Sequence, residues 1–172
     1  MAASTGSTGT SGSSASAASS SPTAVSGASF GLLPESVLAP MTPLVYASDP
    51  QADMAMAASG AQATVNAVFD GGISRTLNYQ GKAVGGVEVY RFNATVPAAG
   101  RAQFVPIMVQ SFAQKVPTPS TLGTTPVQVA DQARNTNITV VGWTHGQEII
   151  IIWASGIPAT QQIAQQYMAQ SA

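Results

Sequence analysis

The segment that most constrains the fold lies near the C-terminus, where residues 138–153 read ITVVGWTHGQEIIIIW. Two runs rich in β-branched residues flank a His-Gly pair, which is the pattern of a β-hairpin. We therefore expect two strands joined by a two-residue turn at His145-Gly146. This turn sets the register, and the expected opposite pairs are Trp143–Glu148, Val141–Ile150 and Thr139–Ile152.

Alternation along the hairpin divides its side chains between two faces. One face is wholly apolar and is the predicted core: Ile138, Val140, Gly142, Ile149, Ile151 and Trp153. The other face is mixed, with Val141, Trp143, Ile150 and Ile152 beside Thr139 and Glu148. Each buried isoleucine contributes roughly 1.5–3 kcal/mol, so the hairpin should carry much of the stability. The second face also needs a cover, either from the extended segment 30–46 or from another subunit.

A helix follows the hairpin. Pro158 suits the first turn, and the apolar positions recur at helical spacing in Ile163, Ala164, Tyr167 and Met168. The opposite face is rich in glutamine. We expect that face to be solvated, with pairing to another chain as the alternative.

The remaining elements are expected from local signals. A short helix from Asp49 to Gly60 has Asp49 as its N-cap and Pro50 at its first position. A longer helix opens at Pro97, and Pro106 should kink or divide it. Strands are expected at 64–70, 87–92 and 127–130, with a long glycine-rich loop over 70–86. The predicted fold is a two-layer α+β sandwich: an antiparallel sheet of about five strands, a central helix and a C-terminal amphipathic helix.

The amino-acid composition changes after residue 28, and this change predicts a single domain over residues 29–172. Residues 1–28 are almost entirely Ser, Ala, Gly and Thr without periodic apolar positions, so we expect a disordered tether. An inert tail is the alternative reading. The segment has neither the basic nor the apolar region of a signal peptide.

Charged residues make up 8% of the chain, against about 25% in ordinary soluble domains. The six basic residues do not cluster, which disfavours binding to nucleic acid or to anionic lipid. No apolar run approaches the ~20 residues that span a bilayer, so direct membrane insertion is not expected. Low charge favours an acidic or extracytoplasmic setting, and compositional drift in a high-GC genome is the alternative.

Few side chains are suited to catalysis. Cysteine is absent and His145 is the single histidine, so thiolate chemistry and His-rich or Cys-rich metal sites are excluded. We expect no catalytic residue, no metal and no cofactor. Surface recognition remains: Trp143, Tyr79 and His145 would line an aromatic-edged patch near one end of the sheet, and Ile150 and Ile152 would extend it as an interface. For Trp143, packing in the core is the alternative.

The C-terminal pattern VVGWTHGQEIIIIWASGIPATQQIAQQYM resembles the ending of small bacterial extracytoplasmic domains, among them lipoproteins of unknown function and domains attached to anti-sigma factors. The resemblance implies an exported, non-enzymatic sensing or binding domain, and it supplies no functional residues. We therefore expect a tethered extracytoplasmic binding domain with a protein partner or self-association. The alternative is a structural subunit of a homo-oligomer or filament that uses the apolar sheet face.

Overall fold

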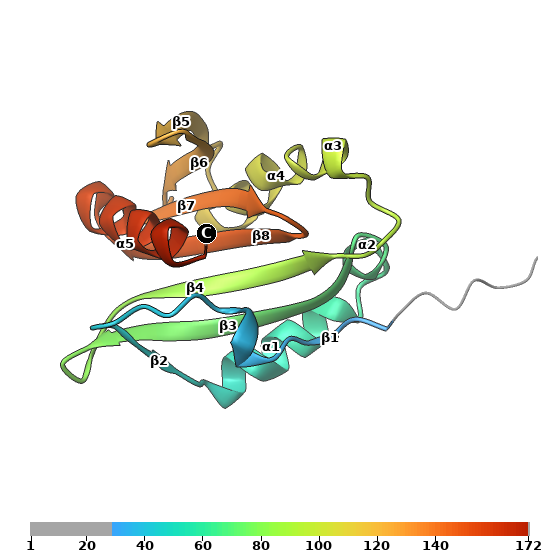
Figure 1. Ribbon diagram of the computed structural model, residues 1–172, viewed down its shortest axis with the longest axis horizontal. Helices are drawn as coiled ribbons and strands as arrows, with labels where there is room; N and C mark the ends of the chain where they lie inside the picture. The colour runs from blue at the N-terminus through green and yellow to red at the C-terminus, as the bar shows by residue number, and fades with distance from the viewer. Residues whose placement is uncertain (1–28, 172) are drawn as a thin grey trace, which may run out of the picture.

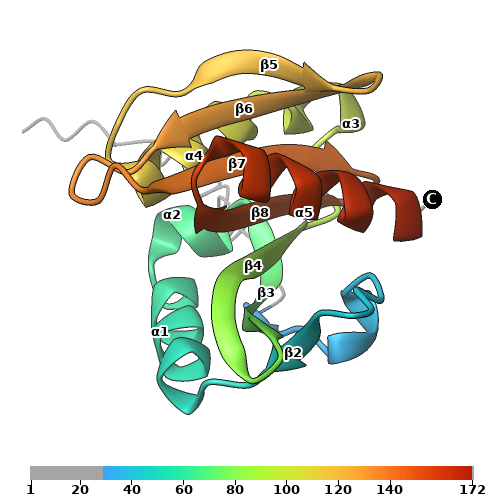
Figure 2. The same ribbon diagram turned by 90° about the vertical axis from the view of Figure 1, so that its left-hand side faces the viewer.

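The computed structural model describes residues 29–171, which form one sheet with helices on both sides (Figures 1 and 2). The strand order is β1-β3-β4-β8-β7-β6-β5, and β2 also pairs with β3. The strands are β1 (Gly31–Leu32), β2 (Val45–Ala47), β3 (Phe69–Tyr79), β4 (Lys82–Phe92), β5 (Thr118–Leu122), β6 (Thr125–Asp131), β7 (Ile138–His145) and β8 (Glu148–Ser155). All pairs are antiparallel except β1 with β3. The α+β class is confirmed, whereas the sheet has eight strands instead of about five.

The helices are the 3-10 turn η1 (Glu35–Val37) and α1 (Pro50–Gly60), α2 (Ala63–Asn66), α3 (Ala98–Arg101), α4 (Phe104–Ala113) and α5 (Ile157–Gln170). In Figure 2, α5 crosses one side of β7 and β8, and α4 lies on the other side of the same strands. Helix α1 packs against β3. None of the helices within residues 29–171 is long and apolar enough to cross a membrane.

Successive side chains of β8 point to opposite faces of the sheet and contribute to two separate hydrophobic cores. Ile150 and Ile152 face α5, and we call this side of the sheet the α5 face. Ile149 and Ile151 face the opposite way, toward α1 and α4, and we call that side the α4 face. Both faces are covered, so the predicted two-layer arrangement is wrong. An almost continuous apolar run in β8 is what a strand buried on both sides requires.

The β7–β8 hairpin is confirmed, but its register differs from the prediction. His145 pairs with Glu148 and Trp143 with Ile150, so the turn residues are Gly146 and Gln147. Gly146 has a φ of 57°, which fits the first position of a type II′ turn. Each residue of β7 pairs with a residue of β8 that lies two positions further along the chain than predicted. A shift of two residues keeps every side chain on its predicted face.

The expected loop over 70–86 is wrong, as is the expected strand over 64–70. Residues 63–66 are helical, and β3 and β4 are 11 residues long each. Gln80 and Gly81 join them with φ angles of 50° and 77°, the pattern of a type I′ turn. The glycines that indicated a loop serve close packing in the strands: a Cβ on Gly86 would overlap the ring of Trp153.

The other expected elements are largely confirmed. Asp49 caps α1 by accepting a 2.8 Å hydrogen bond from the Gln51 amide, and β6 contains the strand expected at 127–130. The expected helix after Pro97 is divided into α3 and α4. The division precedes Pro106, which lies in the first turn of α4, where a missing N–H leaves no intrahelical bond unmade.

Residues 33–44, which we call the strap, cover the α5 face together with α5 itself. Leu38, Ala39 and Met41 are buried in the core of this face. The Gln166 side chain holds the strap by donating to the carbonyls of Met41 (3.1 Å) and Thr42 (2.8 Å). The mixed face of the hairpin is therefore covered within the chain.

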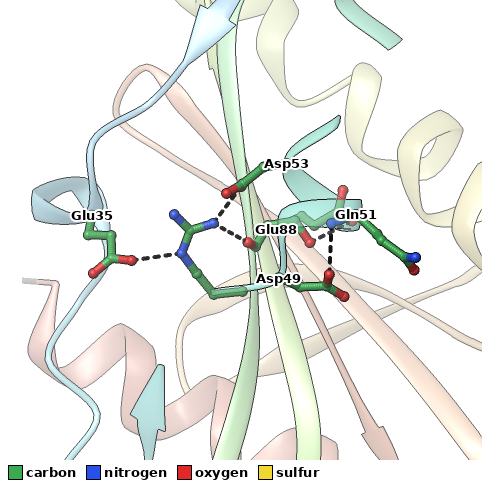
Figure 3. A network of polar contacts seen from close by, with 7 residues as sticks. Glu35, Asp49, Gln51, Asp53 and Glu88 are labelled. Atoms are coloured by element: carbon green, nitrogen blue, oxygen red, sulfur yellow. Dashed lines mark hydrogen bonds and ion pairs between the residues drawn. The ribbon is translucent and has the colours of Figure 1, made fainter. Parts of the chain in front are cut away.

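An ion-pair network joins the strap to β3 and to α1 (Figure 3). Arg75 of β3 has a side chain that is 10% exposed and lies 2.8 Å from Glu35 of η1 and 2.7 Å from Asp53 of α1. Its Nη1 also donates to the carbonyl of Ser74 at 2.7 Å. One guanidinium thus links three segments of the chain.

Candidate functional site

Three of the five predicted surface residues lie in the interior. Trp143 is 2% exposed, and Ile150 and Ile152 are buried with it under α5 and the strap. The Trp143 ring packs edge-on against Tyr167, with 5.8 Å between ring centroids. The interface expectation is therefore wrong for these three residues, whereas the alternatives, core packing of Trp143 and a cover from the segment 30–46, are confirmed.

The remaining two predicted residues lie at opposite ends of the sheet. His145 is exposed at the end of β7, level with Arg91 and Gly71 in the strand register. Tyr79 is 42% exposed and lies at the far end of β3. The aromatic-edged patch of Trp143, Tyr79 and His145 is therefore not formed.

A cleft of about 500 Å³ lies beside His145, and we call it the strap cleft. Its walls come from the strap, from the ends of β4, β7 and β8, and from the last turn of α5. The lining residues are Ser36, Val37, Leu38, Ala39, Pro40, Arg91, His145, Glu148, Ile150, Tyr167, Gln170 and Ser171. The cleft thus brings together two of the predicted residues, His145 and Ile150.

A row of charged and polar side chains crosses three strands at this cleft. Glu148 of β8 is opposite Arg91 of β4 on one side and opposite His145 of β7 on the other. Arg91 Nη2 donates to Glu148 Oε1 at 2.8 Å, and the two side chains are 33% and 18% exposed. This row marks the boundary of the apolar core on the α5 face, because the next residue of β8 on the same face, Ile150, is buried in that core.

The α5 side of the cleft supplies hydroxyl and amide groups. Burial raises the pKa of Tyr167 to about 12, with a further contribution from the charge of Glu148, so the phenol stays protonated at neutral pH. Ser171 Oγ donates to the carbonyl of Tyr167 at 2.8 Å and not to His145. The cleft therefore presents donors and acceptors suited to binding, without an activated hydroxyl.

Sequence reasoning did not single out Arg91 and Glu148. Both lie in predicted strands, but the sequence does not show which face of strand 87–92 points inward, because Val87, Val89 and Arg91 balance Glu88, Tyr90 and Phe92. Each of these two residues is the single charged position at the end of an otherwise apolar strand face, and this pattern could have indicated them. Between residues 29 and 171, no group of three or more His, Asp or Glu side chains is arranged to hold a metal ion.

Comparison of the chain with protein-family models, with curated proteins and with solved structures gives no match.

Proposed function

We propose that this chain is a non-enzymatic binding domain, held outside the cytoplasm on a flexible tether, whose strap cleft binds a small organic carboxylate. The observation that carries the proposal is Arg91, a partly exposed guanidinium at the wall of a cleft of about 500 Å³. Ligand clefts of folded domains have volumes of about 300–1,000 Å³.

The donors in the strap cleft favour an anion with two oxygens. Arg91 has five N–H donors, and its described hydrogen bond, to Glu148, uses one of them. A carboxylate can accept two parallel bonds from the free edge of such a group. His145 and the Gln170 amide line the same cleft and can bind the rest of a polar ligand.

Titration of the labelled protein by NMR tests the proposal. We expect acetate and succinate to shift the amide signals of residues 36–40 and the imidazole of His145, and acetamide and succinamide to leave them unchanged. Arg91→Gln should abolish the shifts, and Lys82→Gln, which removes an exposed charge at the other end of β4, should preserve them. Equal responses to the acids and the amides would contradict the proposal.

Glu148 supplies a second, independent variant. Glu148→Gln removes the carboxylate that competes for Arg91, so carboxylate affinity should rise by several fold if Arg91 is the binding group. An unchanged affinity in this variant would locate the ligand elsewhere.

The proposed tether lies outside the residues that the structure describes, so it and the location are supported by composition alone: residues 1–28 are rich in Ser, Ala, Gly and Thr, and charge is low throughout. Limited proteolysis should cleave within 1–28 and leave the domain at 29–172 intact. Protease treatment of intact source cells, with and without permeabilisation, tests the location. Protection that persists until the cytoplasmic membrane is permeabilised would contradict it.

Assembly into a homo-oligomer or filament is the alternative function. The hairpin face on which that idea depended is packed beneath the strap and α5. Sedimentation over a range of protein concentrations distinguishes the two, because a strict monomer removes the assembly alternative. An enzymatic role is tested by His145→Ala: because the proposal gives this side chain a part in binding alone, the variant should weaken carboxylate binding and abolish no turnover.

A further inference from the structure

A second cleft lies on the α4 face, on the opposite side of the sheet from the strap cleft. It has a volume of about 260 Å³ and runs between α1–α2 and α4, and we call it the α4 cleft. Its walls are mainly aromatic and apolar, with a few hydroxyl and amide groups. The lining residues are Ser59, Gln62, Val65, Phe69, Tyr90, Met108, Ser111 and Phe112.

Two hydroxyl groups in the α4 cleft already use their protons inside the protein. Tyr90 donates its phenolic proton to Glu88 Oε2 at 2.7 Å. Ser59 donates its proton to the carbonyl of Met56 at 2.7 Å. Each oxygen therefore has only lone pairs left for a ligand, so both act as acceptors. A ligand that matches them must bring N–H or O–H donors.

Glu88 places a carboxyl group directly behind Tyr90. Its carboxylate also accepts from Ser74 Oγ at 3.2 Å, and burial raises its pKa. Within residues 29–171, the basic side chains that form ion pairs are Arg75 and Arg91, and their partners are other acids. Within the described residues the Glu88 carboxyl group thus has hydrogen-bond donors but no ion-pair partner, and the Tyr90 hydroxyl links it to a residue that lines the cleft.

We propose that the α4 cleft binds a small organic ammonium ion. Its N–H groups would donate to the oxygens of Tyr90 and Ser59, and its positive charge would be balanced by Glu88. The aromatic walls Phe69 and Phe112 suit both an apolar body and a cation held near ring faces. The volume is below the ~300 Å³ at which larger ligand pockets begin, so the ligand has a single ring or a short alkyl chain.

Calorimetric titration with benzylammonium at neutral pH tests the proposal, with benzyl alcohol as the neutral ligand of the same shape. We expect benzylammonium to bind at least tenfold more tightly than the alcohol. Glu88→Gln keeps an acceptor for Tyr90 and removes the charge, so it should erase this difference. Asp49→Asn is the matched control, because it removes one carboxylate from an exposed N-cap and should leave the affinities unchanged.

A second variant tests whether the ligand lies in the α4 cleft, independently of the carboxyl group of Glu88. Ser111 is exposed at the rim, so Ser111→Phe should fill the opening without disturbing the core and should reduce benzylammonium affinity at least tenfold. Equal affinity for the ammonium ion and the alcohol, or unchanged binding in both Glu88→Gln and Ser111→Phe, would overturn the proposal. Circular dichroism of each variant confirms that these outcomes refer to folded protein.

Discussion

Glu88 is a carboxylate whose ionised form the fold makes costly. Burial raises its pKa, and the hydrogen bonds from Tyr90 and Ser74 oppose the shift only in part. A raised pKa means that the folded state binds this proton more tightly than the unfolded state does. The stability linked to Glu88 is therefore fully present below the unfolded pKa of 4.5 and is lost as pH rises through the folded pKa.

We expect Glu88→Gln to stabilise the protein at neutral pH by on the order of 1 kcal/mol, because a neutral amide avoids the desolvation of a charge. The gain should shrink as pH falls toward the unfolded pKa of 4.5, where Glu88 is itself neutral. Urea denaturation of both proteins over a pH series measures it. A stability difference that does not vary with pH would contradict the assignment.

Arg75 allows a second prediction at this scale. Arg75→Met removes a guanidinium that is 10% exposed and leaves Glu35 and Asp53 without their cation. We expect a loss of about 2 kcal/mol, typical of hydrogen bonds to charged groups. Glu35 is 60% exposed, so Glu35→Gln should cost less than about 1 kcal/mol. Equal losses in the two variants, measured by urea denaturation, would show that the network is not centred on Arg75.

Elements with a strong periodic pattern were predictable, and those stabilised by contacts distant in sequence were not. Helix α5, the N-cap at Asp49 and the division of the β7–β8 side chains between faces follow from local rules. Strand β3 did not, because Gly71 and Gly72 resemble a turn unless the chains packed against them are known. The strap cleft was unpredictable for the same reason, since Arg91 and Glu148 meet only through the pairing of β4 with β8.

Gly142 lets α4 approach the sheet closely. A Cβ at this position would lie 2.5 Å from Val109 Cγ2 and 2.7 Å from Ile151 Cδ1, and both neighbours are buried. We expect Gly142→Ala to destabilise the protein by about 1–3 kcal/mol through overpacking. Gly31→Ala is the matched strand control, because its Cβ meets nothing within 4 Å. A thermal unfolding midpoint for Gly142→Ala equal to that of the control would contradict this packing.

At the scale of the whole molecule, both sheet faces are closed by segments of the same chain. The α5 face is covered by the strap and α5, and the α4 face by α1 and α4. The two proposed sites lie on opposite faces, so a ligand in one cleft does not block the other. Carboxylate and ammonium probes should therefore bind to the same protein molecule at the same time, and calorimetric titration of one in the presence of the other measures this.

The pairing of β4 with β8 also has a kinetic consequence. Strands β3 and β4 form one hairpin, whereas β5 to β8 form a continuous meander. Among the strands of residues 29–171, the only ladder between these two groups joins residues as distant in sequence as Gly85 and Ala154. Closing a long loop costs entropy before any distant contact compensates for it. We expect pulsed hydrogen exchange during refolding to protect amides within each hairpin before those that bridge β4 and β8. The molecule would then acquire its secondary structure in two separate halves, and both binding clefts would appear only when the halves join.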